Sequence, residues 1–210
     1  MVKIIHASAH IEQDVDGLAI LKHIERAGRT CYKSEGNITE DGESAKKFVA
    51  MILKRGHESV LEHYSISVRV ICDRGVTHEI VRHRINAFSQ ESTRYCNYGA
   101  DKFGNEITVI EPRPFLPDRE YSVWLDAMHL AEKYYMMLIE RGVSPQIARS
   151  VLPNSLKTEI VWTANLRQWR HIFKLRTSKA AHPQMREIMI PLLQEFKDKI
   201  PVMFDDIAVE

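Results

Sequence analysis

The sequence is poor in cysteine, with only Cys31, Cys72 and Cys96 among its 210 residues. No two of them have the spacing of a Cys-x-x-Cys motif, and an odd number of thiols cannot pair completely within one chain. These features argue against a disulfide framework and against a cysteine-based zinc site. They favour reduced thiols in a cytoplasmic protein.

Long hydrophobic runs and a dominant charge are also missing. No apolar run approaches the roughly 20 residues that span a bilayer, and residues 1–8 lack the apolar segment of a signal peptide. Lys and Arg number 29 and Asp and Glu 28, which leaves a net charge of +1. We therefore expect no membrane anchor and no general nucleic-acid partner.

Several catalytic and cofactor motifs are absent as well. There is no Gly-x-Gly-x-x-Gly or P-loop sequence, so a bound phosphate must be held mainly by arginines and loop amides. There is no Gly-x-Ser-x-Gly elbow. Ser89 and Ser92 follow His83 closely, but a catalytic triad is defined in space and cannot be inferred from this proximity.

The histidine spacings argue against a metal site. His57 and His63 lie six residues apart, and His78 and His83 lie five apart. Zinc-binding pairs on a helix lie four apart, whereas these pairs diverge by about 120° and about 140°. We expect no metal.

The composition, with 44% hydrophobic and 27% charged residues, suits one globular domain over residues 1–210. Hydrophobic periodicity predicts an α+β fold, rich in helices, with a small antiparallel or mixed sheet. Asp118 is the predicted N-cap of the longest helix, and the proline-rich segment 111–117 is predicted as a loop. Helices are predicted over 16–27, 44–55, 75–84, 118–141, 145–152, 166–175 and 183–199, and strands over 2–7, 64–72 and 157–163.

The richest cluster of polar donors lies between Arg82 and Tyr95. Arg82, His83 and Arg84 come together, and Arg94 follows a polar run. Arginine presents a planar fork of donors that suits phosphates and other oxyanions. On a continuing helix Arg82 and Arg84 diverge by about 200°. Either the helix ends here, or the two arginines serve different ligands or subunits; a solvated basic helix end is the plainer alternative.

A second candidate segment runs from Asn165 to Arg176. As a helix it has an apolar stripe that includes Trp169, and Arg176 projects within about 20° of that residue. A buried arginine is costly unless it meets an anion or a carboxylate. A frayed helix end or a structural glutamate partner would explain the position, but we favour a ligand role.

Together these segments resemble the flavin-dependent thymidylate synthases. The signature of that family is Arg-His-Arg, a short gap and Ser-x-Arg-Tyr, which here reads Arg82–Arg84 and Ser92–Tyr95. The resemblance extends over most of residues 20–190, in the same order. Its other blocks are Arg29–Tyr32, His57–His63, Arg149–Pro153 and Asn165–Arg176.

The resemblance implies an α+β homotetramer with active sites shared between subunits. Its members convert dUMP to dTMP for de novo dTTP biosynthesis. They use 5,10-methylenetetrahydrofolate as carbon donor and FAD as hydride carrier, and NADPH reduces the flavin. No enzyme nucleophile is required, which agrees with cysteines that lie in no recognisable nucleophile context.

The resemblance also implies residue roles. Arg176 is the implied catalytic residue, which favours ionisation of the pyrimidine at N3. The implied FAD contacts are Ser59, Arg82, His83, Arg84, Gln90, Asn165, Arg167 and His171. The implied dUMP contacts are Glu79, Arg82, Gln90, Glu91, Ser92, Thr93, Arg94, Arg149 and Arg176. The chain departs from some members at Glu79, where they have Gln, and at Ser89-Gln90, where they have Asn-Glu.

Two other function classes compete with this interpretation. A non-catalytic nucleotide- or RNA-binding protein could use the same arginines, with binding that falls steeply with salt. The near-neutral total charge argues against it. A metal hydrolase would be sensitive to chelators, and the histidine spacing already argues against that class.

Overall fold

A computed structural model describes residues 2–112 and 114–209. Its contacts divide the chain into two compact units, which are described separately. The single domain expected over residues 1–210 stays a prediction. Unit 1 comprises Met1–Ser8, Val70–Arg82 and Phe88–Val161, and unit 2 comprises Ala9–Arg69, His83–Ala87 and Trp162–Glu210.

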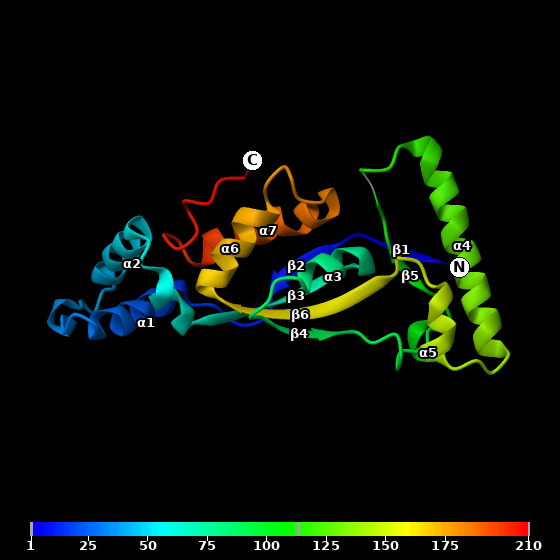
Figure 1. Ribbon diagram of the computed structural model, residues 1–210, viewed down its shortest axis with the longest axis horizontal. Coiled ribbons are helices and arrows are strands. Elements are labelled where there is room, and N and C mark those ends of the chain that lie inside the picture. Colours follow the sequence, from blue (N-terminus) through cyan, green and yellow to red (C-terminus); the bar gives the residue numbers. More distant parts are fainter. Residues whose placement is uncertain (1, 113, 210) are drawn as a thin grey trace. The chain divides into compact units, whose positions relative to one another are not determined.

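The fold is α+β, as predicted, with helices dominant (Figure 1). The strands are β1 Lys3–Ile5, β2 Ser8–Ile11, β3 Ser65–Asp73, β4 Ala87–Gln90, β5 Thr108–Ile110 and β6 Lys157–Asn165. The α-helices are α1 Gly17–Thr30, α2 Glu43–Arg55, α3 Arg74–Ile80, α4 Asp118–Glu140, α5 Pro145–Ala148, α6 Leu166–Arg176 and α7 Pro183–Lys199. The 3-10 helices are η1 Glu35–Asn37, η2 Glu58–His63, η3 Asp101–Phe103 and η4 Arg149–Val151.

The strands form a parallel pair, β1 with β5, and a four-stranded sheet in the order β2-β3-β6-β4. In β3 the side chains of Ile66, Val68 and Val70 are fully buried, as the alternation predicts. β6 runs two residues beyond its predicted end. The sequence did not predict β2, β4 and β5, because three or four residues are too few to show an alternation.

Capping residues and glycines in the sequence mark most of the helix ends. Asp16 caps α1 by accepting a hydrogen bond from the Ala19 N–H, and α2 ends at Gly56, whose φ of 68° suits glycine. One cap was wrong: Pro117 is the N-cap of α4, and Asp118 is its first helical residue. The acidic side chain still favours the helix dipole there. Within the predicted 111–117 loop, Arg113 lies outside the described residues.

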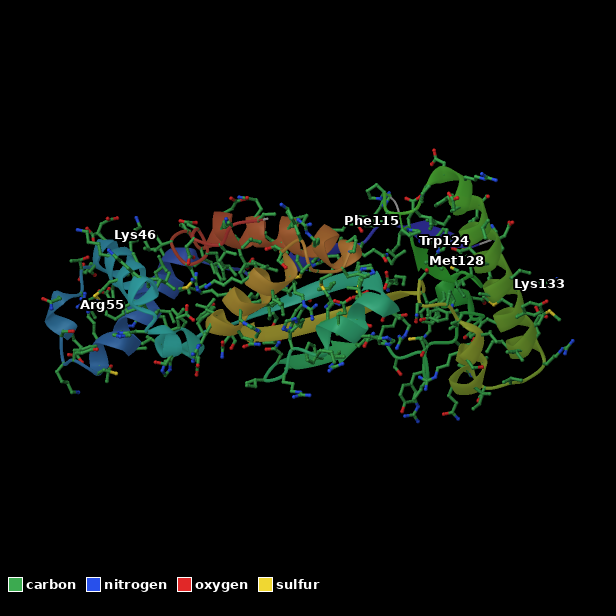
Figure 2. All side chains as sticks on the ribbon, turned by 45° about the horizontal axis from the view of Figure 1, so that its top comes forward. Lys46, Arg55, Phe115, Trp124, Met128 and Lys133 are labelled. Carbon is green, nitrogen blue, oxygen red and sulfur yellow. The ribbon has the colours of Figure 1, made fainter. Side chains whose placement is uncertain are left out.

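Each unit has its own apolar core. In unit 1 the core includes Met128 and Tyr135 of α4, and Trp124 of the same helix packs against it (Figure 2). In unit 2, Trp169 and Phe173 of α6 pack with Phe196 of α7. Trp169 also donates a hydrogen bond of 3.0 Å to the Ile66 carbonyl of β3. These contacts fix α6 against β3 and α7. No described helix combines the length and apolar character needed to cross a membrane.

Candidate active site

The Arg82–Arg84 segment lies outside the preceding helix. α3 ends at Ile80, four residues before its predicted end, and Ile85 adopts a left-handed φ of 67°. The structure therefore agrees with the first of the two alternatives left open by the sequence, namely that the helix ends before Arg82. The turn leaves Arg82 and Arg84 exposed, whereas His83 is only 5% exposed.

His83 meets Arg176 inside unit 2. Arg176 is the last residue of α6, and its Nε–H donates a hydrogen bond of 2.8 Å to Nε2 of His83. The imidazole lies against the Trp162 ring, with centroids 5.4 Å apart. Because Nε2 accepts this bond, the hydrogen bond assigns the ring proton to Nδ1. Arg176 thus belongs to a helix that is not frayed, and His83, one of the groups that it contacts, is a neutral acceptor.

The environment keeps His83 neutral. Burial, the positive charge of Arg176 and the neighbouring His171, in that order of size, together lower the pKa of His83 to about 4. The imidazole is therefore a hydrogen-bond acceptor at neutral pH. Protonation would remove the acceptor lone pair and place two cations in contact.

This pKa predicts an acid-dependent loss of stability. Between about pH 6.5 and about pH 4 the unfolded chain binds a proton at residue 83 that the folded chain does not bind. The contribution of His83 to the free energy of unfolding is therefore fully present above that range. It falls as the pH decreases through the range, by at most about 1.4 kcal/mol per pH unit. Urea unfolding of wild type and His83→Phe at several pH values measures the two slopes.

We expect His83→Phe to be less stable at pH 7 but less dependent on pH. His129→Phe, which removes an exposed histidine of α4, serves as the control and should keep the wild-type slope. Identical slopes in wild type and His83→Phe would show that His83 is not held neutral.

A cavity of about 530 Å³ lies in unit 2, at the start of α6. Asn165 caps this helix by accepting from the Gln168 N–H at 2.9 Å. The cavity brings together three of the predicted flavin residues, Asn165, Arg167 and His171, with Ile85 and Lys174. Ser59 is an exposed residue of η2, and Ser59, His83 and Arg84 are not among the lining residues.

Charged residues dominate this cavity, and the two arginines on its wall differ. Arg170 is buried and donates two hydrogen bonds of 2.7 Å to Asp206, so its role is structural. Arg167 is exposed and pairs with Glu62 at 2.6 Å. An exposed pair of this kind is weak and can exchange for a ligand. Arg167 and Lys174 therefore offer cations that fit an anionic dinucleotide such as FAD.

Unit 1 contains a separate cavity of about 540 Å³. It brings together two predicted dUMP residues, because Nη1 of Arg149 donates to the buried hydroxyl of Thr93 at 3.2 Å. Ser150 and Asn154 add polar groups to its lining.

Arg74 also lines this cavity and was missed by the sequence analysis. Its Nη1 is buried and has no hydrogen-bond partner among residues 2–112 and 114–209. Its backbone N–H donates to the Asn154 carbonyl at 2.9 Å, which fixes the residue at the start of α3. A buried cationic donor without a partner is costly, so an anion in the cavity would stabilise it. No motif around Arg74 could have indicated this role.

The remaining predicted dUMP residues of unit 1 lie outside the cavity lining. Glu91 is held by its own chain: Tyr98 donates to one carboxylate oxygen at 2.7 Å and Lys157 to the other at 2.8 Å. Gln90 donates to the hydroxyls of Thr77 and Thr158. These hydrogen bonds of Gln90 and Glu91 stabilise the position of the chain segment that leads to Thr93. The other members of this set are Glu79, which is half-buried on α3, Arg82, Ser92, and Arg94, which is exposed.

The three cysteines are free, and burial raises the pKa of the Cys72 thiol. In the described part of the chain no group of three or more His, Cys, Asp or Glu side chains could hold a metal ion.

Comparison with known proteins identifies the family. The family model described as thymidylate synthase complementing protein matches residues 19–202. The chain belongs to the flavin-dependent thymidylate synthase family. The family prediction made from the sequence is thereby confirmed, whereas the roles of individual residues stay predictions.

Two relatives show how far the similarity extends. A flavin-dependent thymidylate synthase of Pyrococcus furiosus is 38% identical over 152 residues, which cover 71% of this chain and 62% of the relative. The chain thus spans less than two thirds of that protein. A flavin-dependent thymidylate synthase of Geobacter sulfurreducens is 32% identical over 201 residues, covering 90% of this chain and 85% of the relative.

The fold is shared with a solved structure. The UMP/dUMP methylase PolB of Streptomyces cacaoi, bound with 5-Br dUMP, superposes with a TM-score of 0.78. The match covers 97% of this chain and 95% of that one, at 22% identity. At this identity the likeness concerns the α+β architecture.

Proposed function

We propose that the chain catalyses the reductive methylation of dUMP to dTMP. The carbon comes from 5,10-methylenetetrahydrofolate, which leaves as tetrahydrofolate, and NADPH supplies the reducing equivalents through FAD. The observation that carries the proposal is the pairing of Arg176 with a neutral His83 in a member of this family.

Arg176 is the proposed catalytic residue. His83 accepts one of its N–H groups without neutralising its charge, so the guanidinium is oriented and remains cationic. A fixed cation at the pyrimidine stabilises the anion formed when N3 loses its proton. The ionised ring is richer in electrons at C5, the carbon that receives the new methyl group.

In this proposal each of the two cavities binds a different ligand. Arg149, Thr93 and Arg74 in unit 1 would hold the phosphate of dUMP, because they combine two guanidinium groups with a hydroxyl. Arg167, Asn165 and His171 in unit 2 would hold FAD, with Lys174 as a further cation. FAD, once bound, supplies hydride transfer.

The proposal includes a cytoplasmic homotetramer whose active sites are shared between subunits. Arg82, Arg84 and Arg94 support it, since all three are exposed and are therefore available to ligands held partly by another subunit. The reaction would serve the de novo supply of dTTP.

The purified protein should be yellow, and it should form dTMP only when dUMP, 5,10-methylenetetrahydrofolate and NADPH are all present. Chromatographic separation of dUMP and dTMP, with one component omitted at a time, measures this requirement. A colourless protein that takes up no FAD would contradict the proposal. Nucleotide binding with a steep salt dependence and no NADPH oxidation would instead support a non-catalytic binding protein.

A further inference from the structure

Unit 2 contains a third cavity, of about 520 Å³, to which the proposed function assigns no ligand. It is lined by α1, by the turn that follows α1 and by α2, and the two helices lie side by side in Figure 1. The lining includes three cations, Arg29, Lys47 and Arg55, and one acid, Glu43. We call it the α1–α2 cavity.

A buried carboxylate organises one wall of this cavity. Glu25 of α1 is fully buried and accepts hydrogen bonds of 2.8 Å from Nε of Arg29 and from the Ser44 hydroxyl. The Ser44 hydroxyl accepts in turn from the Thr39 N–H at 2.9 Å. Because Glu25 engages Nε and Nη2 of Arg29, Nη1 is left for a ligand. A guanidinium that the protein has already oriented loses little freedom when it binds an anion.

The other two cations are not held in this way. Lys47 and Arg55 of α2 are exposed, and Arg55 is labelled in Figure 2. Among the residues that the structure describes, neither forms an ion pair. Glu43 is already paired with Lys46, at 2.7 Å. The lining therefore has an excess of positive charge, which favours an anionic ligand.

The spacing of these cations indicates the class of ligand. Eight residues separate Lys47 from Arg55, which is about 12 Å along a helix. A single phosphate meets both only if the two side chains fold towards each other, whereas a chain of carboxylates meets each where it lies. Phe48 and Met51 add apolar surface between them, and the Tyr32 ring is 71% exposed. An aromatic ring attached to a polycarboxylate fits this lining.

The α1–α2 cavity adjoins the proposed FAD cavity along the chain. Arg55 is the last residue of α2, and Glu58, three residues later, lines the FAD cavity of the same unit. Three residues span at most about 11 Å. A co-substrate whose ring reacts at the flavin can therefore extend past Arg55 towards Lys47.

We propose that the α1–α2 cavity binds the tail of the folate co-substrate. The p-aminobenzoyl ring packs on Tyr32, and the glutamate carboxylates pair with Arg29, Lys47 and Arg55. The inference rests on the proposed function, which assigns no residue to the folate. Folates carry one glutamate or a chain of γ-linked glutamates, and each further glutamate adds a carboxylate. We therefore expect the cavity to favour the longer chains.

Titration calorimetry on the purified holoenzyme tests the binding step without turnover. The probes are p-aminobenzoyl-glutamate and its γ-linked triglutamate. Wild type should bind the triglutamate roughly tenfold more tightly, and added salt should reduce the difference. The double variant Lys47→Ala/Arg55→Ala should lose this preference. Lys54→Ala removes an exposed cation of α2 that does not line the cavity, and it should keep the preference.

Steady-state kinetics shows whether the anion belongs to the folate or to NADPH. With the triglutamate of 5,10-methylenetetrahydrofolate, the double variant should have a KM for the folate that is raised roughly tenfold. Its kcat and its KM for dUMP and NADPH should stay within about twofold of wild type. Far-UV circular dichroism checks the fold. Arg29 is left in place, because its loss would leave the charge of Glu25 buried without a cation.

Three results would overturn the proposal. They are equal binding of the two probes by wild type, a preference for the triglutamate that survives in the double variant, and a raised KM for NADPH with an unchanged KM for the folate. The last result would assign the cavity to the 2′-phosphate of NADPH. Failure of the proposed function would look different, because wild type would then form no dTMP with either folate.

Discussion

Arg176→Ala is expected to lower kcat for dTMP formation by roughly 10²–10³-fold, the usual effect of removing one oriented group that stabilises a developing anion. FAD should remain bound, because the cavity lined by Asn165, Arg167 and His171 does not include Arg176. Steady-state kinetics gives the change in kcat, and the flavin absorbance of the purified variant gives its cofactor content.

Two further variants separate charge from geometry at this position. Arg176→Lys keeps a cation but loses the planar fork that can donate from Nε to His83 while other N–H groups meet a ligand, so most of the loss should remain. Lys179→Ala removes an exposed cation three residues away and should leave kcat unchanged. Near-normal turnover of Arg176→Ala would show that its pairing with His83 is only structural.

Arg74→Met is expected to change stability and substrate affinity in opposite directions. The protein alone should melt at a higher temperature, because a buried guanidinium nitrogen without a partner is replaced by an apolar side chain. The KM for dUMP should rise by roughly 10- to 100-fold, since a charge-assisted hydrogen bond contributes about 1.5–3 kcal/mol. Thermal unfolding without ligand and steady-state kinetics measure the two effects.

Arg149→Met provides the matched comparison in the same cavity. Arg149 is exposed, so its loss should raise KM for dUMP with little change in the melting temperature. An unchanged KM in Arg74→Met would exclude Arg74 from the phosphate site. A lower melting temperature would show that its guanidinium is satisfied by the protein itself.

The long elements were predictable from sequence because their apolar periodicity is strong. α7 has the predicted bounds of residues 183–199, and β3 shows the predicted alternation of Ile66, Val68 and Val70. β2, β4 and β5 were missed because strands of three or four residues gain their stability from their neighbours in the sheet. The end of α3 was missed for a different reason: no Gly or Pro directly follows Ile80 to mark the end of the helix.

The site was predictable where it depends on a single helix. The projection of residues 165–176 placed Arg176 on the apolar side of α6, and the structure confirms the helix. Its partner could not be deduced in this way, because His83 is 93 residues away and meets Arg176 only after β6 and α6 have packed. The role of Arg74 could not be predicted for the same reason, because the cavity that it lines is formed by segments far apart in the sequence.

A single-turnover experiment tests the central claim most directly. The flavin of the purified enzyme is reduced with one equivalent of NADPH without oxygen, and dUMP and 5,10-methylenetetrahydrofolate are then added. The account predicts that the flavin absorbance returns and that one dTMP forms for each flavin reoxidised. A flavin that stays reduced, or that reoxidises without forming dTMP, would contradict it.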